Sequence, residues 1–134
     1  MKTQKLSLIL IVVITALMAG CAGSSGDVVV TGDQSNSTIT VETGDVIAIQ
    51  LSANPSTGYG WTVENLDSAI LEQVGEIEYK QEKSDQPIVG APATAIMRLK
   101  AVGSGETAVK LIYHRSWETD VEPLETFSMN VVVK

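Results

Sequence analysis

The segment 47–61, IAIQLSANPSTGYGW, alternates apolar and small or polar residues and then breaks into a stretch rich in Pro, Ser and Gly. A period of two is typical of a half-buried β-strand, whereas a helix would repeat every 3.6 residues. Pro55 restricts its own φ and keeps Asn54 extended, and Gly58 permits a positive φ. The segment therefore predicts a strand, a rigid protruding loop at 54–59, and then a second strand.

The same period of two recurs along most of the 134-residue chain. Further alternating segments lie at 38–42, 61–63, 95–102, 109–114 and 127–133, and turn residues separate them at 43–45, 90–92, 103–105 and 122–123. The only helix candidate is a single turn near 67–71. Short strands joined by turns predict an all-β fold, an immunoglobulin-like sandwich of two packed antiparallel sheets.

Two aromatic residues follow the loop at 54–59. Trp61 is in phase with Val63 on an early central strand, so we expect its indole to lie in the core. Tyr59 has two interpretations, because it either plugs the base of the loop or faces a partner. The hydroxyls of Ser56 and Thr57 are available for hydrogen bonds within the loop or outside it.

The N-terminal segment is typical of an export signal. Lys2 and Lys5 precede an apolar run at 6–18, which is shorter than the about 20 residues of a membrane-spanning helix. The run ends in LMAGC at 17–21, which is typical of a lipoprotein processing site with Cys21 as the lipidated N-terminus; Met replaces the more usual Leu at the third position before the Cys. The alternative is a plain secretory signal.

These features predict the domain organisation and the location of the protein. We expect a signal peptide at 1–20, a lipidated N-terminus and flexible tether at 21–35, and one domain at 36–134. The protein is expected to be exported, as a membrane-anchored lipoprotein in the periplasm or at the cell surface, or as a secreted protein. Asn36 begins a glycosylation sequon.

Charge and composition exclude several functions. Loss of Lys2 and Lys5 with the signal leaves seven basic residues against sixteen acidic ones, a net charge of −9. Such a surface repels nucleic acid and anionic membranes, so we expect the protein to contact the membrane only through its lipid. We also expect a monomer.

The residues that could form a catalytic or metal site are few. Cys21 and His114 are the only residues of their kinds and the carboxylates are scattered, so no catalytic set, metal site or cofactor is predicted. His114 is expected at a solvated rim.

Three predicted loops fall at one end of such a sandwich, because alternate connections emerge at the same end. They are the loop at 54–59, a second at 86–94 and a third at 115–123. Trp117 lies outside the apolar alternation, in a polar loop beside Arg115. It either folds back on the rim or is an exposed anchor, since Trp and Arg dominate binding energy at interfaces.

These loops resemble those of the chagasin family, which inhibits papain-like cysteine proteases. The resemblance covers about residues 36–134. The family's Asn-Pro-Thr/Ser-Thr-Gly-aromatic loop is matched in full by Asn54, Pro55, Ser56, Thr57, Gly58 and Tyr59. Its Gly-X-Gly-Gly loop is matched at Gly90 alone, followed by Ala91, Pro92 and Ala93. Its Arg-Pro-Trp/Phe loop retains Arg115 and Trp117 around Ser116, and the set also includes Trp61 and Tyr113.

The resemblance implies a non-enzymatic inhibitor whose partner is a papain-like cysteine protease. Loop 54–59 would enter the active-site cleft, and the other two loops would grip either side. Thr57 would lie near the catalytic centre, and Trp117 would pack on an aromatic surface beside the cleft. Arg115 would hydrogen-bond at the rim or brace its own loop. The alternative is an immunoglobulin-like binding or adhesion module that retained the fold without inhibition.

Overall fold

The computed structural model describes residues 26–83, 85 and 89–134. These residues form nine strands and two short 3-10 turns, with no α-helix among them. The elements are β1 (Asp27–Thr31), η1 (Gly32–Gln34), β2 (Ser37–Val41), β3 (Val46–Ala53), η2 (Pro55–Thr57), β4 (Gly60–Asn65), β5 (Leu71–Gln73), β6 (Glu78–Gln81), β7 (Ala93–Ala101), β8 (Gly105–His114) and β9 (Glu125–Val133). Within the described residues, no helix is long and apolar enough to cross a membrane.

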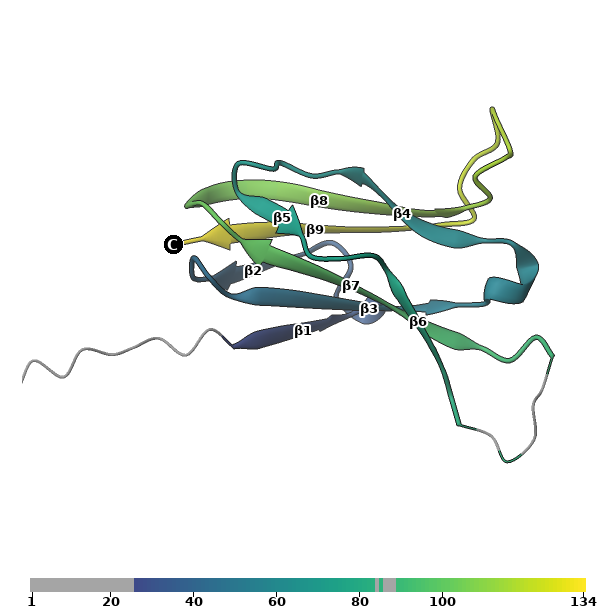
Figure 1. The fold of residues 1–134 in the computed structure, drawn as a ribbon. Helices are drawn as coiled ribbons and strands as arrows, with labels where there is room; N and C mark the ends of the chain where they lie inside the picture. Colours follow the sequence, from purple (N-terminus) through teal and green to yellow (C-terminus); the bar gives the residue numbers. More distant parts are fainter. Residues whose placement is uncertain (1–25, 84, 86–88) are drawn as a thin grey trace, which may run out of the picture.

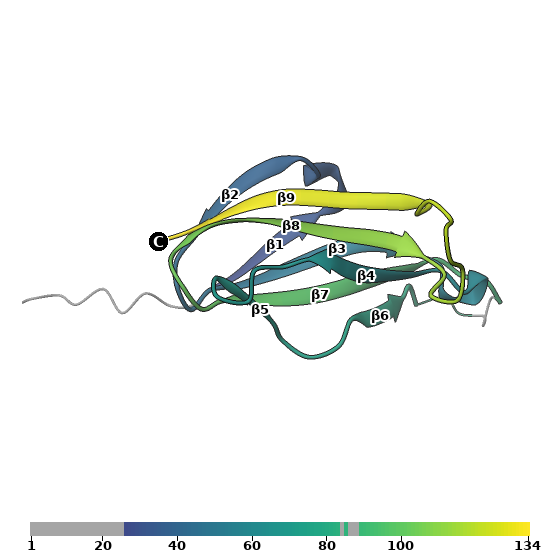
Figure 2. The same cartoon turned by 90° about the horizontal axis from the view of Figure 1, so that it is seen from above.

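The strands form two sheets packed face to face, which confirms the predicted all-β sandwich (Figures 1 and 2). One sheet has the order β1-β3-β7-β5. Strand β6 also pairs with β7, at residues 93–96, whereas β5 pairs with it at 99–101. The other has the order β2-β9-β8-β4. This two-layer arrangement buries one face of each sheet against the other.

The sheets are mixed, which corrects the expectation of purely antiparallel pairing. Strand β1 runs parallel to β3, and β2 runs parallel to β9, whereas the other pairs are antiparallel. A short hairpin forces two consecutive strands to run antiparallel. Neither parallel pair is joined by a hairpin, so the direction of these edge strands is set by the path of the chain between the sheets.

The folded domain begins earlier than expected. Strand β1 pairs with β3 along its whole length, and Val30 is completely buried. The tether predicted over 21–35 therefore does not extend into 27–35; the expected signal peptide and Cys21 lie outside the described residues. One buried residue in a run of three valines produces no alternation, so the sequence pattern did not reveal this edge strand.

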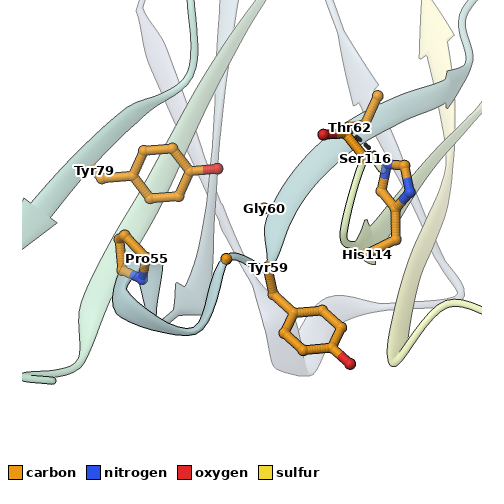
Figure 3. Close-up of a pocket in the computed structure, with 8 residues that line it drawn as sticks. Pro55, Tyr59, Gly60, Thr62, Tyr79, His114 and Ser116 are labelled. Atoms are coloured by element: carbon orange, nitrogen blue, oxygen red, sulfur yellow. Dashed lines mark hydrogen bonds between the residues drawn. The ribbon is translucent and has the colours of Figure 1, made fainter. Parts of the chain in front are cut away.

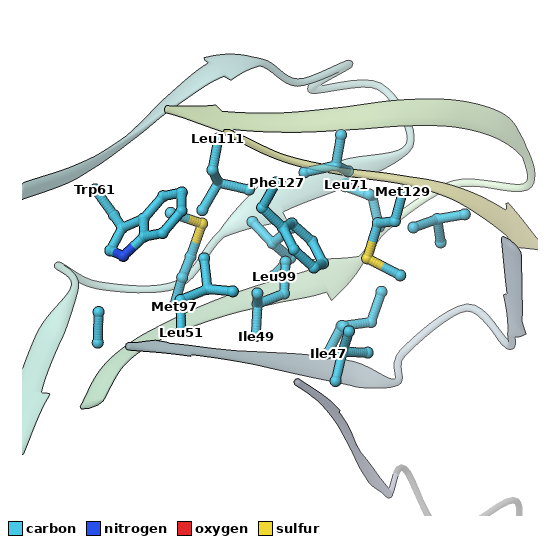
Figure 4. Close-up of a cluster of buried hydrophobic side chains, with 14 of the residues drawn as sticks. Ile47, Ile49, Leu51, Trp61, Leu71, Met97, Leu99, Leu111, Phe127 and Met129 are labelled. Carbon is cyan, nitrogen blue, oxygen red and sulfur yellow. The ribbon is translucent and has the colours of Figure 1, made fainter. Parts of the chain in front are cut away.

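The core lies between the sheets and follows the predicted alternation closely (Figure 4). Trp61 is 6% exposed, and its Nε1 donates a hydrogen bond to the Ser52 carbonyl at 3.0 Å, which confirms its place in the core. The other buried side chains come mainly from alternate positions of β3, β7, β8 and β9. Ala48 and Ile96 are exceptions, because both are buried although they alternate out of phase with the core positions.

The expected helical turn near 67–71 is a hydrogen-bonded turn without a helix. The backbone amides of Ile70 and Leu71 both donate to the Asp67 carbonyl, at 3.1 and 2.9 Å. Leu71 is completely buried and begins strand β5, so the chain extends there to bury that side chain.

Candidate functional site

Three loops meet at one end of the sandwich, opposite the start of β1 and the C terminus (Figure 1). They connect β3 to β4, β6 to β7, and β8 to β9. The Asn54 side-chain amide donates to the Gly90 carbonyl at 3.3 Å, and Arg115 Nε donates to the Thr57 carbonyl at 3.1 Å. The structure thus confirms that the three predicted loops lie together.

Loop 54–59 is a tight, internally bonded turn. Asn54 is extended with φ −137°, as expected before a proline, and Pro55–Thr57 form the 3-10 turn η2. The amides of Thr57 and Gly58 donate to the carbonyls of Asn54 and Pro55, each at 3.2 Å. Gly58 has φ +78°, the left-handed region that glycine tolerates at least cost.

Both hydroxyls of this loop are used within it. Ser56 Oγ donates to Asn54 Oδ1 at 2.6 Å, and Thr57 Oγ1 donates to the Asn54 carbonyl at 2.7 Å. Of the two alternatives for these hydroxyls, the structure supports local bonding. Pro55, Ser56 and Thr57 are nevertheless exposed, so the loop presents a rigid outer surface.

Tyr113, on strand β8, supports the base of the loop. Its hydroxyl accepts a hydrogen bond from the Asn54 amide at 2.8 Å, although the side chain is 5% exposed. Its ring lies 5.4 Å from that of Tyr59 and 5.1 Å from that of Trp61, centroid to centroid. Tyr59 is half-buried in this stack, so it plugs the base of the loop. The family resemblance includes Tyr113, but its place on an alternating strand indicated only core packing and gave no sign of its bond to Asn54.

The third loop runs from Arg115 to Leu124, where β9 follows at Glu125. The Arg115 guanidinium lies 4.4 Å above the Tyr59 ring centroid and donates through Nη1 to Glu118 Oε1 at 3.2 Å. Together with its bond to Thr57, these contacts place Arg115 between the first loop and Glu118 of its own loop. Glu118 was not singled out from the sequence, since a carboxylate in a polar loop carries no local signal.

Trp117 combines features of both interpretations. Its side chain is 66% exposed, yet its indole lies against Gly58 of the first loop. A Cβ added at Gly58 would overlap Trp117 Cη2 and would lie 3.1 Å from Cζ2. The space that glycine leaves at this position is therefore occupied by Trp117 of the same chain.

The second loop is shorter than predicted. Ala93 is buried and begins strand β7, which also contains Thr94, so the loop predicted over 86–94 ends at Pro92. Residues 86–88 lie outside the described part of the chain. Gly90 has φ +83° and Ala91 is half-buried, whereas Pro92 is exposed.

A hollow of about 310 Å³ lies beside loop 54–59 (Figure 3). Its lining includes Tyr79 and Pro55, the backbone around Gly60, and His114 with Thr62. Tyr79 Oη accepts a hydrogen bond from the Trp61 amide at 3.2 Å, and His114 Nε2 lies 3.1 Å from Thr62 Oγ1. His114 is half-buried on the outward face of β8 at this rim, as expected. Among the described residues, no group of three or more His, Cys, Asp or Glu side chains is arranged to hold a metal ion.

The loop end also carries exposed apolar side chains. Within the described residues, the most exposed large apolar side chains are Val89, Trp117, Val121 and Leu124, which are 60–99% exposed. All of them lie on the second and third loops. Exposed apolar side chains gathered at one end of a domain are typical of a protein-binding surface.

Comparison with known proteins agrees with this geometry. The sequence profile described as "Chagasin family peptidase inhibitor I42" matches residues 40–131. Amoebiasin-2 of Entamoeba histolytica is 33% identical over 106 residues, which are 79% of this chain and 85% of that protein. Chagasin of Trypanosoma cruzi is 31% identical over 101 residues, which are 75% of this chain and 92% of that protein.

Among solved structures, the fold is similar to the crystal structure of the cysteine protease inhibitor EhICP2 from Entamoeba histolytica. The TM-score is 0.72 at 32% sequence identity, and the match covers 81% of this chain and 96% of that one. The chain therefore belongs to the chagasin family of peptidase inhibitors.

Proposed function

We propose that this protein is a reversible, competitive inhibitor of papain-like cysteine proteases, and that it inserts loop 54–59 into the active-site cleft. The observation that carries the proposal is the exposed, internally bonded loop 54–59, which the other two loops flank at one end of the sandwich. The family supports it, because its members are peptidase inhibitors and not enzymes.

The proposed mechanism is steric exclusion of substrate. Thr57 would lie near the protease's catalytic centre, and the small Gly58 would let the two backbones approach closely. Trp117 would pack on an aromatic surface beside the cleft, with Gly90, Ala91 and Pro92 on the other flank. A loop already fixed by its own hydrogen bonds loses little conformational freedom on binding, so the contacts contribute most of their free energy to affinity.

The second candidate function is an immunoglobulin-like binding or adhesion module without inhibitory activity. The departures from the family pattern favour it, because Pro92 and Ser116 stand where the family has Gly and Pro.

Steady-state kinetics with papain distinguish the two functions. We expect the apparent inhibition constant to rise linearly with substrate concentration, as competition for the cleft requires, while trypsin stays fully active as the control. Full papain activity in excess inhibitor would favour the binding module. Inhibition that does not depend on substrate concentration would exclude occupancy of the cleft.

We further propose that the protein is exported and anchored through a lipid on Cys21, and that the anchored domain is monomeric. The basic residues, the short apolar run and the small residues before Cys21 support export and processing. Cys21→Ser should move the protein from the membrane fraction to the soluble fraction, and mass spectrometry of the natural chain should show an acylated N-terminal Cys. An unmodified N-terminus at Ala22 would instead indicate a plain secretory signal.

A further inference from the structure

We propose that Arg115 and Glu118 form a brace that holds loop 54–59 in its binding shape, which makes Arg115 a positioning residue. The brace is defined by the contacts of these two side chains with each other and with the loop. Its consequence for inhibition rests on the function proposed above, whereas its effect on the loop is a property of the free protein.

The first support is the way in which Arg115 uses its donors. Nε donates to the Thr57 carbonyl at 3.1 Å, and Nη1 donates to Glu118 Oε1 at 3.2 Å. One face of the guanidinium covers the Tyr59 ring at 4.4 Å. The Nε donor and this face are therefore directed at the first loop, and Nη1 binds the third loop, so the guanidinium links the two loops.

The second support is the place where the brace meets the loop. The Thr57 carbonyl belongs to the last residue of the 3-10 turn and immediately precedes Gly58, whose φ is +78°. Glycine has more backbone freedom than any other residue, so this peptide is where the loop would move most readily. A charge-assisted hydrogen bond to this carbonyl restricts the motion at that point.

The third support is the role of Glu118 in orienting Arg115. Its amide donates to the Arg115 carbonyl at 3.1 Å, which closes a tight turn and brings its carboxylate to Nη1. The two side chains are 34% and 29% exposed, and an ion pair at such a site adds little stability by itself. The pair therefore matters through geometry, since it aims Nε at loop 54–59.

Amide hydrogen exchange in the free, full-length protein tests the brace without any protease. The reporters are the amides of Asn54, Thr57, Gly58 and Tyr59, all of which are hydrogen-bonded in the folded loop. Arg115→Ala should accelerate their exchange by about tenfold or more, the effect of removing a hydrogen bond to a charged group. Arg98→Ala is the matched control, because Arg98 makes a similar 3.0 Å ion pair with Glu78 on another part of the surface and should leave these amides unchanged.

A double-mutant cycle on protease affinity tests the mechanism. We expect Arg115→Ala to weaken inhibition about tenfold to a hundredfold, and Glu118→Gln to weaken it less. In the Arg115→Ala background, Glu118→Gln should have no further effect, because Glu118 acts only through Arg115. The melting temperatures of all variants are measured in parallel to confirm folding.

The outcomes separate the brace from other roles. Weaker inhibition by Arg115→Ala with unchanged amide exchange would overturn the brace and would make Arg115 a direct protease contact. Additive effects of Arg115→Ala and Glu118→Gln would also overturn it. If the natural protein inhibits no papain-like protease, the proposed function fails, but faster exchange in Arg115→Ala would still establish the brace.

Discussion

Gly58 and Trp117 constrain each other, although 59 positions separate them in the sequence. The indole of Trp117 occupies the space next to the Gly58 Cα, so only glycine fits at position 58 without displacing it. The same indole keeps 66% of its surface exposed. One side of the ring thus supports loop 54–59, while the rest is available to a partner.

The first prediction concerns Trp117→Ala. The exposed part of the indole is expected to anchor the inhibitor on the protease, so binding should weaken by about 2–4 kcal/mol, the range of an interface hot spot. Stability should change little, because the side chain is mostly solvated. Titration calorimetry and thermal melts give the two quantities. A large fall in melting temperature with unchanged affinity would identify Trp117 as a rim-packing residue.

The second prediction concerns Gly58→Val, which should abolish measurable inhibition while the sandwich remains folded. The added side chain would strain a left-handed backbone by about 1–2 kcal/mol and would collide with Trp117. Gly75→Val is the matched control, because Gly75 has a similar φ of +72° and no neighbour within 4 Å of an added Cβ. The control should lose some stability but retain inhibition. A folded Gly58→Val protein that inhibits papain normally would show that the loop does not enter the cleft.

At the scale of elements, strand β8 and the start of β4 support loop 54–59 through a stack of aromatic rings. Tyr113 of β8 lies between Tyr59 and Trp61, which flank the start of β4. Its hydroxyl reaches the amide of Asn54, where the chain leaves β3. The position of the loop is therefore determined by strands from both sheets.

The third prediction is that Tyr113→Phe lowers both stability and inhibition. It leaves the Asn54 amide without its acceptor in a mostly buried place, at a cost of about 1–3 kcal/mol. Tyr79→Phe likewise removes the hydroxyl that accepts a hydrogen bond from the Trp61 amide. Tyr79 is 39% exposed, however, so water can replace its hydroxyl and the loss of stability should be smaller. Chemical denaturation and inhibition constants of both variants provide the comparison. Equal effects would show that Tyr113 has no special role in supporting the loop.

The fourth prediction concerns the core contribution of β4. Trp61→Ala should lower the free energy of unfolding by about 3–5 kcal/mol, because it leaves a cavity between the sheets and loses the bond from Nε1 to the Ser52 carbonyl. Urea denaturation measures this loss. A normally stable Trp61→Ala protein would contradict the burial of the indole between the sheets.

At the scale of the whole molecule, the three loops and the start of the N-terminal strand β1 lie at opposite ends of the sandwich (Figure 1). The lipid proposed on Cys21 would therefore be joined to the domain at the end opposite to the three loops.

The fifth prediction separates steric blocking from covalent chemistry. A preformed loop that fills the cleft needs nothing from the protease's nucleophile. The inhibitor should therefore bind a papain-like protease whose catalytic Cys is replaced by Ala within about tenfold, or about 1.4 kcal/mol, of the active enzyme. Mass spectrometry after long incubation with active protease should recover loop 54–59 uncut. A covalent adduct, or a cleavage that inhibition requires, would refute the proposed mechanism.

Much of this architecture is predictable from the sequence because it depends on local patterns. The alternation of apolar residues is a property of neighbouring positions, and it predicts the strands, the two-layer fold and the burial of Trp61. The extended Asn54 and the positive φ of Gly58 likewise follow from the covalent constraints of proline and glycine. The loop sequences also predicted membership of the chagasin family.

The tertiary structure alone decides which residues support the loop. The bonds from Asn54 to Tyr113 and from Arg115 to Thr57 join positions 59 and 58 residues apart, and neither pair has a local signal. The parallel pairing of β1 and β2 depends in the same way on where the chain crosses between sheets. The physical reason is that a local pattern records which side of a strand is buried, whereas a long-range contact exists only after both sheets have packed and brought distant loops to one end.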